Sequence, residues 1–499
     1  MNDEYLSKDA KADIQGFVTS GYGHLIYAAY LLFGIGDRQD AQDWLRSTLS
    51  QVTTAQSWRT DPDLPKSRPQ RALNIAFTAV GLTALGLSGP ALLSFPDEFR
   101  AGIASERRSQ ILGDTGTSAP ETWEVGRPNT PSPHFMLILH ATSQIDLDAW
   151  CSEIIEVALQ HGLVEYTSAA QQGYRPQHDR EPFGFFDAVG QPDIHGIKGT
   201  GIQTGEFILG YRNEYGYFPV SPAVSALEDP FHVLPASENP YRGDAYRDIG
   251  ANGTFLVYRK LQQDVAGFWR FMREESVRNK GKADPRYMVW LASNMVGRWP
   301  NGVPLVLSPE PPGRDATATN EFGYAQVDPK GIKCPFGAHI RRTNPRDQLR
   351  PAGPAESIHM SARHRILRRG RAFGTPLFDP MLLDNPDDPA TKQTLLALAD
   401  DGGSRGIHFF CVNASIKRQF EFVQQAWMDN PHFNGLVDNR DPISGDNEPE
   451  ARSPSAMVIP GRHGGLRTAP LPRFVTVLGG LYLFMPSMTA LRYLANKPL

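Results

Sequence analysis

Residues 135–162 have the sequence FMLILHATSQIDLDAWCSEIIEVALQHG, and this stretch decides the expected fold class. The first eight residues, FMLILHAT, are almost all apolar and predict a buried strand. A helix is expected next, with Asp146 near its start and Gly162 at its end. Its apolar residues fall on one face: Leu147, Trp150, Ile154 and Ala158. A buried strand followed by a one-sided helix indicates an α+β unit, in which helices cover one side of a sheet.

The C-terminal half has the same alternation. Residues 391–401 predict a helix closed by Gly402 and Gly403, and residues 406–412 predict a strand. The run FVTVLGGLYLFM at 474–485 predicts two strands around Gly479 and Gly480, because a glycine pair is a hairpin signal. Residues 402–406 also match G-x-S-x-G, but they follow a helix and precede a strand. A nucleophile elbow has the reverse order, so a helix C-cap and a turn are favoured.

Composition limits the class of protein. Of the 499 residues, 40% are hydrophobic and 21% are charged, which is typical of a globular chain. Fifty basic and 54 acidic residues balance closely, so binding of nucleic acid through bulk charge is not expected. The sequence has no P-loop, H-E-x-x-H or C-x-x-C motif, which excludes the usual signatures of kinases, zinc proteases and thioredoxins.

The cysteines and the apolar runs indicate the cellular compartment in which the protein is expected. Cys151, Cys334 and Cys411 are odd in number and far apart, which excludes a disulfide framework or a Cys-rich zinc site. The N-terminal residues show no signal peptide, and the apolar run at 26–35 is too short to span a bilayer. We therefore expect a cytoplasmic protein in a reducing compartment, without a membrane partner.

Glycine and proline are concentrated in three long segments, approximately 109–133, 300–332 and 439–473. They are too long for simple turns, so we expect ordered loops that pack around a site.

The first candidate site residue is His339, in CPFGAHIRRTNPRD at 334–347. A neutral imidazole is a good iron ligand, and Arg341, Arg342 and Arg346 follow closely. Several guanidinium groups would pair with the two propionates of a haem. From spacing alone, a loop or helix that binds another anion remains the alternative.

Two further segments carry charged residues in apolar surroundings. Asp187 lies in EPFGFFDAVGQPDI at 181–194, where a carboxylate is costly unless it is paired or used. An Asx-turn that caps the local backbone is the alternative. Arg368 follows the apolar pair Ile366 and Leu367 in HRILRRGRAFG at 364–374. An acidic partner would draw its guanidinium group into the protein. An ordinary surface arginine is the alternative.

These segments, with others along nearly the whole chain, resemble the dye-decolourising peroxidases, a family of haem enzymes. Matching phrases include DIQG at 13–16, NIAFTAVGLTALGL at 74–87, TGEFILGY at 204–211, NGTFLVYRKL at 252–261 and RFVTVLGGLYLFMPSM at 473–488. The length is similar to that of the longer bacterial or fungal members. The resemblance implies two ferredoxin-like α+β domains with antiparallel sheets and peripheral helices. We place them at 1–175 and 176–499, with the haem in the second.

The resemblance also implies roles for individual residues. His339 matches the proximal ligand of a non-covalent haem b, while Asp187 and Arg368 match the distal acid and the distal arginine. The implied haem contacts are Ala188, Val189, Gly190, Asn344, Pro345, Arg346, Arg368, Ile407 and Phe409. Ile407 and Phe409 lie two residues apart on a predicted strand, so they share a face.

The implied activity is oxidation of phenols and bulky dyes by hydrogen peroxide, through an oxoferryl intermediate. One departure from the family pattern stands out, because Ala188 replaces the last glycine of the G-x-x-D-G signature. Glycine is used where φ is positive or where the backbone approaches a ligand closely. A non-enzymatic haem-binding or haem-trafficking protein of the same fold is therefore the alternative, with Ala188 as its mark.

Overall fold

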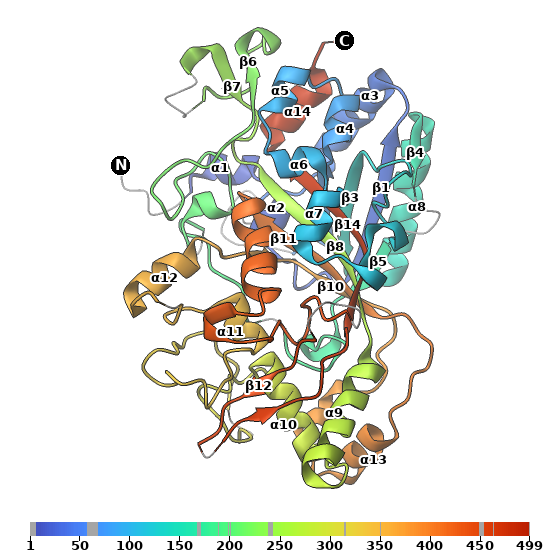
Figure 1. The fold of residues 1–499 in the computed structure, drawn as a ribbon. Helices are drawn as coiled ribbons and strands as arrows, with labels where there is room; N and C mark the ends of the chain where they lie inside the picture. The colour runs from blue at the N-terminus through green and yellow to red at the C-terminus, as the bar shows by residue number, and fades with distance from the viewer. Residues whose placement is uncertain are drawn as a thin grey trace.

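The computed structural model describes residues 6–56, 68–166, 171–187, 189–197, 199, 201–237, 243–313, 316–349, 351–448, 454–462 and 464–498. One large sheet contains strands in the order β10-β5-β1-β3-β2-β14-β8-β11-β9, with β4 paired to β1. An additional pairing joins β10, the first strand of this order, to β11, the last but one, so the sheet closes into a barrel. Neighbouring strands run antiparallel, and helices surround them (Figure 1). The α+β class is therefore confirmed.

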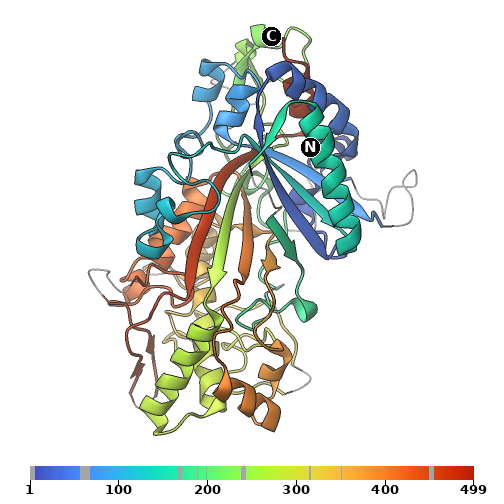
Figure 2. The ribbon, with the colours of Figure 1, turned by 90° about the vertical axis from the view of Figure 1, so that its right-hand side faces the viewer.

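Each half of the chain contributes five strands to this barrel. The N-terminal strands are β1 (Tyr27–Ile35), β2 (Arg71–Phe77), β3 (Phe135–Ala141), β4 (Leu163–Glu165) and β5 (Gln171–Tyr174). The C-terminal strands are β8 (Thr254–Gln263), β9 (Leu367–Arg368), β10 (Arg371–Phe373), β11 (Gly406–Asn413) and β14 (Val475–Met485). Figure 2 shows the two sets side by side.

Each set of strands has a ferredoxin-like order. In the N-terminal half the neighbours are β5-β1-β3-β2, and in the C-terminal half they are β14-β8-β11, followed by β9 and β10. The fourth strand of each set thus lies beside the first, and the third lies between the first and the second, as in a βαββαβ unit. The two halves meet through one residue pair on each side, Phe484 with Phe77 and Ala372 with Tyr174. The predicted boundary after residue 175 directly follows β5 and stays a prediction.

The longer helices form two groups. Helices α3 (Arg38–Thr48), α8 (Gln144–Gln160) and α14 (Met488–Asn496) pack on the apolar outer face of the barrel. Helices α9 (Val265–Lys280), α10 (Pro285–Val296) and α13 (Pro389–Ala397) pack together below the strands in Figure 1, and α12 (Pro354–Ala362) is a further helix. Shorter ones are α1 (Lys8–Asp13), α2 (Gly16–Thr19), α4 (Ala79–Ala84), α5 (Gly89–Leu93), α6 (Asp97–Ala101), α7 (Glu106–Leu112) and α11 (His339–Thr343). Two small sheets pair β6 (Ala223–Ser225) with β7 (Tyr246–Asp248) and β12 (Val458–Ile459) with β13 (Leu466–Arg467). Among the described residues, no helix is both long enough and apolar enough to cross a bilayer.

The stretch at 135–162 folds as predicted. All seven residues of β3 are buried in the middle of the N-terminal half-sheet. The α8 helix begins after Ser143, whose hydroxyl accepts a hydrogen bond from the backbone N–H of Asp146. Such a cap satisfies one of the free donors at a helix start. Leu147 and Trp150 are buried beneath the helix.

Two sequence predictions in the C-terminal half are wrong. Residues 475–485 form one strand instead of a hairpin, with a register shift between Val477 and Gly479. A side chain at Gly479 would meet Val125 at 2.9 Å, so the glycine serves close backbone approach rather than a turn. The α13 helix ends at Ala397, before the predicted Gly402–Gly403 cap. Those glycines instead donate to the carboxylates of the preceding aspartates in a separate turn.

Alternation along β8 and β11 separates two environments. Leu256, Tyr258 and Phe410 point into the barrel, where they pack with apolar residues of β1 and β3. Leu261 and Phe409 point to the other side and line a cavity. Successive side chains of a strand lie on opposite faces, so these two strands separate the barrel core from the cavity.

Candidate active site

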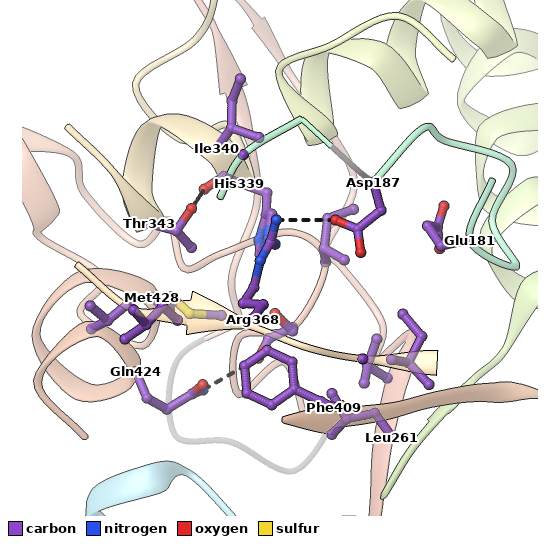
Figure 3. A pocket seen from close by; sticks show the side chains of 18 of the residues that line it. Glu181, Asp187, Leu261, His339, Ile340, Thr343, Arg368, Phe409, Gln424 and Met428 are labelled. Atoms are coloured by element: carbon purple, nitrogen blue, oxygen red, sulfur yellow. Dashed lines mark hydrogen bonds and ion pairs between the residues drawn. The ribbon is translucent and has the colours of Figure 1, made fainter. Parts of the chain in front are cut away.

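A cavity of about 290 Å³ lies on the outer face of β8, β11 and β14. Its wall includes His339, Asp187 and Arg368, which Figure 3 shows with their side chains directed into the same space. The three glycine- and proline-rich segments contribute to the wall through Asp114, Asn320 and residues 443–446. They are therefore ordered where they line the cavity, as expected.

His339 is the first residue of α11, and its ring is tied to a buried carboxylate. Its Nδ1 lies 2.9 Å from Oδ2 and 3.1 Å from Oδ1 of Asp441, whose side chain is 0% exposed. Asp441 also accepts hydrogen bonds from the backbone N–H groups of Ile443 and Ser444, both at 2.9 Å. Burial alone would raise the pKa of Asp441, but the His339 imidazole and the Ser444 N–H more than offset this and lower it.

This contact fixes the tautomer of His339. An ionised carboxylate only accepts hydrogen bonds, so in the neutral ring Nδ1 carries the hydrogen and Nε2 keeps its lone pair. A carboxylate that orients an imidazole in this way is the usual companion of a metal-binding histidine. Sequence reasoning did not find Asp441, which is 102 residues away in the chain.

The arginines beside His339 differ from the sequence prediction. Arg341 and Arg342 are buried away from the cavity wall. Arg341 binds Asp328 at 2.7 Å, and Arg342 donates to the backbone oxygens of the segments at 427–430 and 439. They hold α11 in place, and neither of them lines the cavity. Of the three predicted arginines, only Arg346 lines the cavity.

Other arginines complete a basic part of the wall. Arg298 and Arg365 line the cavity with Arg346 and Arg368. Burial, reinforced by the neighbouring guanidinium groups, lowers the pKa of Arg365 to about 10. Arg298 and Arg346 bond to backbone carbonyls, and among the described residues only Arg368 of these four has a carboxylate partner. Guanidinium groups gathered in one wall of a cavity attract an anionic group.

Asp187 and Arg368 form the second polar pair of the cavity. Arg368 lies in the short strand β9, which pairs with β11, and the Gln191 side chain accepts its backbone N–H at 2.8 Å. Its guanidinium is 3.1 Å from Oδ1 of Asp187. The Asp187 side chain is 53% exposed and that of Arg368 is 28% exposed. Within the described part of the chain no backbone N–H donates to this carboxylate, which disfavours the Asx-turn alternative.

The remaining predicted contacts divide into two groups. Val189, Gly190, Asn344, Ile407 and Phe409 line the cavity, as the resemblance implies. Pro345 is buried but does not line it. Ala188 lies outside the described residues, so the prediction about its φ angle stays a prediction.

Glu181 also lines the cavity, and sequence reasoning missed it. Its carboxylate accepts hydrogen bonds from the backbone N–H groups of Phe183 and Phe185, at 3.0 and 2.9 Å, and from Gln263 at 2.7 Å. It thereby ties the loop before Asp187 to β8. Burial, with a smaller contribution from the charge of Asp187, raises the pKa of Glu181 to about 7. No local motif marks it, because Gln263 is 82 residues away.

The cavity wall suits a haem. The apolar side chains of Phe186, Ile407 and Phe409 would contact a flat macrocycle, and the arginine cluster would meet its propionates. His339 offers one imidazole nitrogen. The described residues contain no group of three or more His, Cys, Asp or Glu side chains arranged to hold a bare metal ion. An iron at His339 would therefore need other ligands, which a porphyrin supplies.

The N-terminal half matches a family model described as the DyP dimeric alpha+beta barrel domain, over residues 13–176. Peroxidase 2 of Mycetinis scorodonius is 28% identical over 96% of this chain and 86% of its own length. The multifunctional dye peroxidase DyP2 of an Amycolatopsis species is 28% identical over 93% of this chain and 91% of its own length. These matches together support the dye-decolorizing peroxidase family for this chain. It is thus a peroxidase, an oxidoreductase of a haem-protein family, and not the non-enzymatic alternative.

Solved structures agree on the fold of this peroxidase. The DyP-type peroxidase of an Anabaena species has a TM-score of 0.71 and covers 98% of this chain and 95% of its own. It is 22% identical, so the likeness concerns the fold. An ancestral D-type dye-decolorizing peroxidase has a TM-score of 0.72 at 25% identity, over 97% of this chain and 98% of its own.

Proposed function

We propose that the chain binds one haem b non-covalently through His339 and uses hydrogen peroxide to oxidise phenols and bulky dyes. The observation that carries this proposal is the pairing of two polar groups in one cavity. One is an imidazole oriented by Asp441, and the other is the ion pair of Asp187 with Arg368. The absence of a C-x-x-C-H motif from the sequence supports non-covalent attachment.

His339, oriented by Asp441, would hold the iron. The Asp441 carboxylate keeps the Nδ1 hydrogen in place, so Nε2 is the nitrogen available to a metal. The negative charge of Asp441 makes the imidazole a stronger donor of electron density. Arg346 and Arg365 are the candidates to bind the propionates, because both are half-buried in the wall and have no carboxylate partner among the described residues.

Asp187 and Arg368 would act on peroxide. The haem, when bound, supplies the redox centre at which the peroxide bond is broken. Asp187 takes a proton from one peroxide oxygen and returns it to the other, which leaves as water. Arg368 stabilises the negative charge that develops as the bond breaks.

The dyes and phenols are proposed as electron donors because the relatives are named for dyes. The test uses purified, haem-loaded protein. Acid and organic solvent should release the haem, and hydrogen peroxide should change its absorbance within the mixing time of a stopped-flow instrument. An anthraquinone dye and a simple phenol should then be oxidised with turnover. Full haem loading without turnover of either donor would contradict the proposal.

A further inference from the structure

A tyrosine and a histidine are hydrogen-bonded inside the barrel, on the face of the strands opposite to the cavity. The hydroxyl of Tyr258 lies 3.0 Å from Nδ1 of His408. Tyr258 belongs to β8 and His408 to the neighbouring β11. Their exposed fractions are 0% and 1%, so bulk water does not reach the pair.

A second hydrogen bond determines which atom donates. Nε2 of His408 lies 3.1 Å from the backbone oxygen of Gln172. A carbonyl oxygen only accepts, so Nε2 carries the ring hydrogen and Nδ1 has a lone pair. Tyr258 must then be the donor, and its phenolic hydrogen points at a base.

The surroundings of the pair are aromatic. The rings of Tyr30 and Phe373 are each 5.0 Å from that of His408, and Phe410 is 5.0 Å from Tyr258. The charged groups that influence the pair are Lys260, which acts on His408, and Glu124, which acts on Tyr258. Burial, followed by Lys260, lowers the pKa of His408 to about 3, so the ring is neutral in the resting protein.

The pair is one strand layer away from the proposed haem cavity. Arg259 and Leu261, on either side of Lys260 in β8, line the cavity, as do Ile407 and Phe409 on either side of His408 in β11. Tyr258 precedes Arg259 directly. An oxidising group in the cavity would therefore have this tyrosine as a close neighbour through the backbone of two paired strands.

We propose that Tyr258 and His408 form an internal redox site that donates an electron to the peroxide-oxidised haem. The oxidised centre gains one electron, and Tyr258 loses one. The phenolic proton moves to Nδ1 of His408, which leaves a neutral tyrosyl radical and an imidazolium. An external reductant later returns the electron, and His408 returns the proton. The inference rests on the proposed peroxidase function, which supplies the oxidant.

Tyr30 provides a matched control within the same core. It is also fully buried, and its ring is 6.2 Å from that of Tyr258. Its hydroxyl has no hydrogen-bond partner among the described residues. Oxidation of Tyr30 would leave its phenolic proton without an acceptor, so Tyr30 could not release the proton as it loses an electron. The base His408 thus distinguishes the two tyrosines.

The experiment mixes haem-loaded protein with one equivalent of peroxide, without an external donor, and freezes it for electron paramagnetic resonance. The absorbance change on mixing reports the peroxidase step separately. The wild type should give a tyrosyl signal that Tyr258→Phe removes and Tyr30→Phe keeps. His408→Gln retains an acceptor but removes the base, so it should slow radical formation by ~10²-fold, as for loss of a proton-transfer group.

A measurement on the wild type covers the case in which a core variant does not fold. High-field spectra in H2O and D2O should show an exchangeable hydrogen bound to the phenoxyl oxygen, because the imidazolium donates back to it. A normal absorbance change with no tyrosyl signal, or with a signal that survives in Tyr258→Phe or lacks the exchangeable hydrogen, would overturn the inference. If peroxide leaves the absorbance unchanged, the proposed function fails first, and the inference falls with it.

Discussion

The two polar groups of the cavity are held in opposite ways. His339 is bound to a fully buried carboxylate, and the arginines that follow it in α11 are fixed by buried backbone oxygens. Asp187 and Arg368 share one ion pair at 3.1 Å, and the Asp187 side chain is 53% exposed. A group that holds a cofactor must not move, whereas a group that exchanges protons with a substrate must stay accessible. The difference between the two sides matches this division.

His339 and Asp441 form the rigid side of the cavity, and substitution of His339 should have the largest effect. His339→Ala removes the only proposed protein ligand, so most of the haem should be lost during purification, as measured by the Soret absorbance per chain. Asp187→Asn is the matched control and should retain the haem. Full retention in His339→Ala with an unchanged spectrum would show that another residue binds the iron.

Asp187 and Arg368 form the accessible side of the cavity, and their substitution should slow the reaction with peroxide without loss of haem. Asp187→Asn removes a proton-transfer group and should slow the reaction with peroxide by ~10²–10⁴-fold. Arg368→Leu removes a charge-stabilising group and should slow it by ~10²–10³-fold. Stopped-flow mixing with peroxide measures both rates through the haem absorbance.

The pH profile separates the two roles because the rate ranges overlap. In the wild type the rate should fall at low pH, where Asp187 becomes protonated. Asp187→Asn should lose this fall, because asparagine has no carboxylate to protonate, whereas Arg368→Leu should keep it. If Asp187→Asn kept both the rate and the profile of the wild type, another group would be the base.

Asp441→Asn tests how much the rigid side depends on its buried charge. Asparagine still accepts the hydrogen of His339 but carries no negative charge. Loss of such a partner typically lowers affinity for the metal by ~10–100-fold. Transfer of haem to an excess of apomyoglobin would measure this as a faster loss from the variant. Equal transfer rates would show that Asp441 only orients the ring.

Sequence reasoning found the residues that lie in recognisable local segments. His339, Asp187 and Arg368 each belong to a short stretch that resembles the family, and all three line the cavity. Asp441 and Glu181 were missed because their partners are distant in the chain, and only the folded structure brings them together. The error at Gly479 has a related cause. A glycine that admits a neighbouring backbone and one that forms a turn leave the same signal in a single sequence.

Substitution of Glu181, in the loop before Asp187, should have the smallest effect of these variants. Its pKa rises from 4.5 in the unfolded chain to about 7 in the folded one, mainly through burial. The folded state therefore binds this proton more tightly, and the associated stability is present below pH 4.5 and lost as the pH rises through about 7. Glu181→Gln cannot ionise, so the free energy of unfolding of the wild type should decline relative to the variant across this window, by at most about 1.4 kcal/mol per pH unit. Urea unfolding between pH 4 and 8 measures the difference, with the exposed Glu106→Gln as control. Parallel profiles for the wild type and Glu181→Gln would show that this carboxylate is ionised as easily in the folded loop as in water. The loop before Asp187 would then be open to solvent rather than tied to β8 through a dry contact.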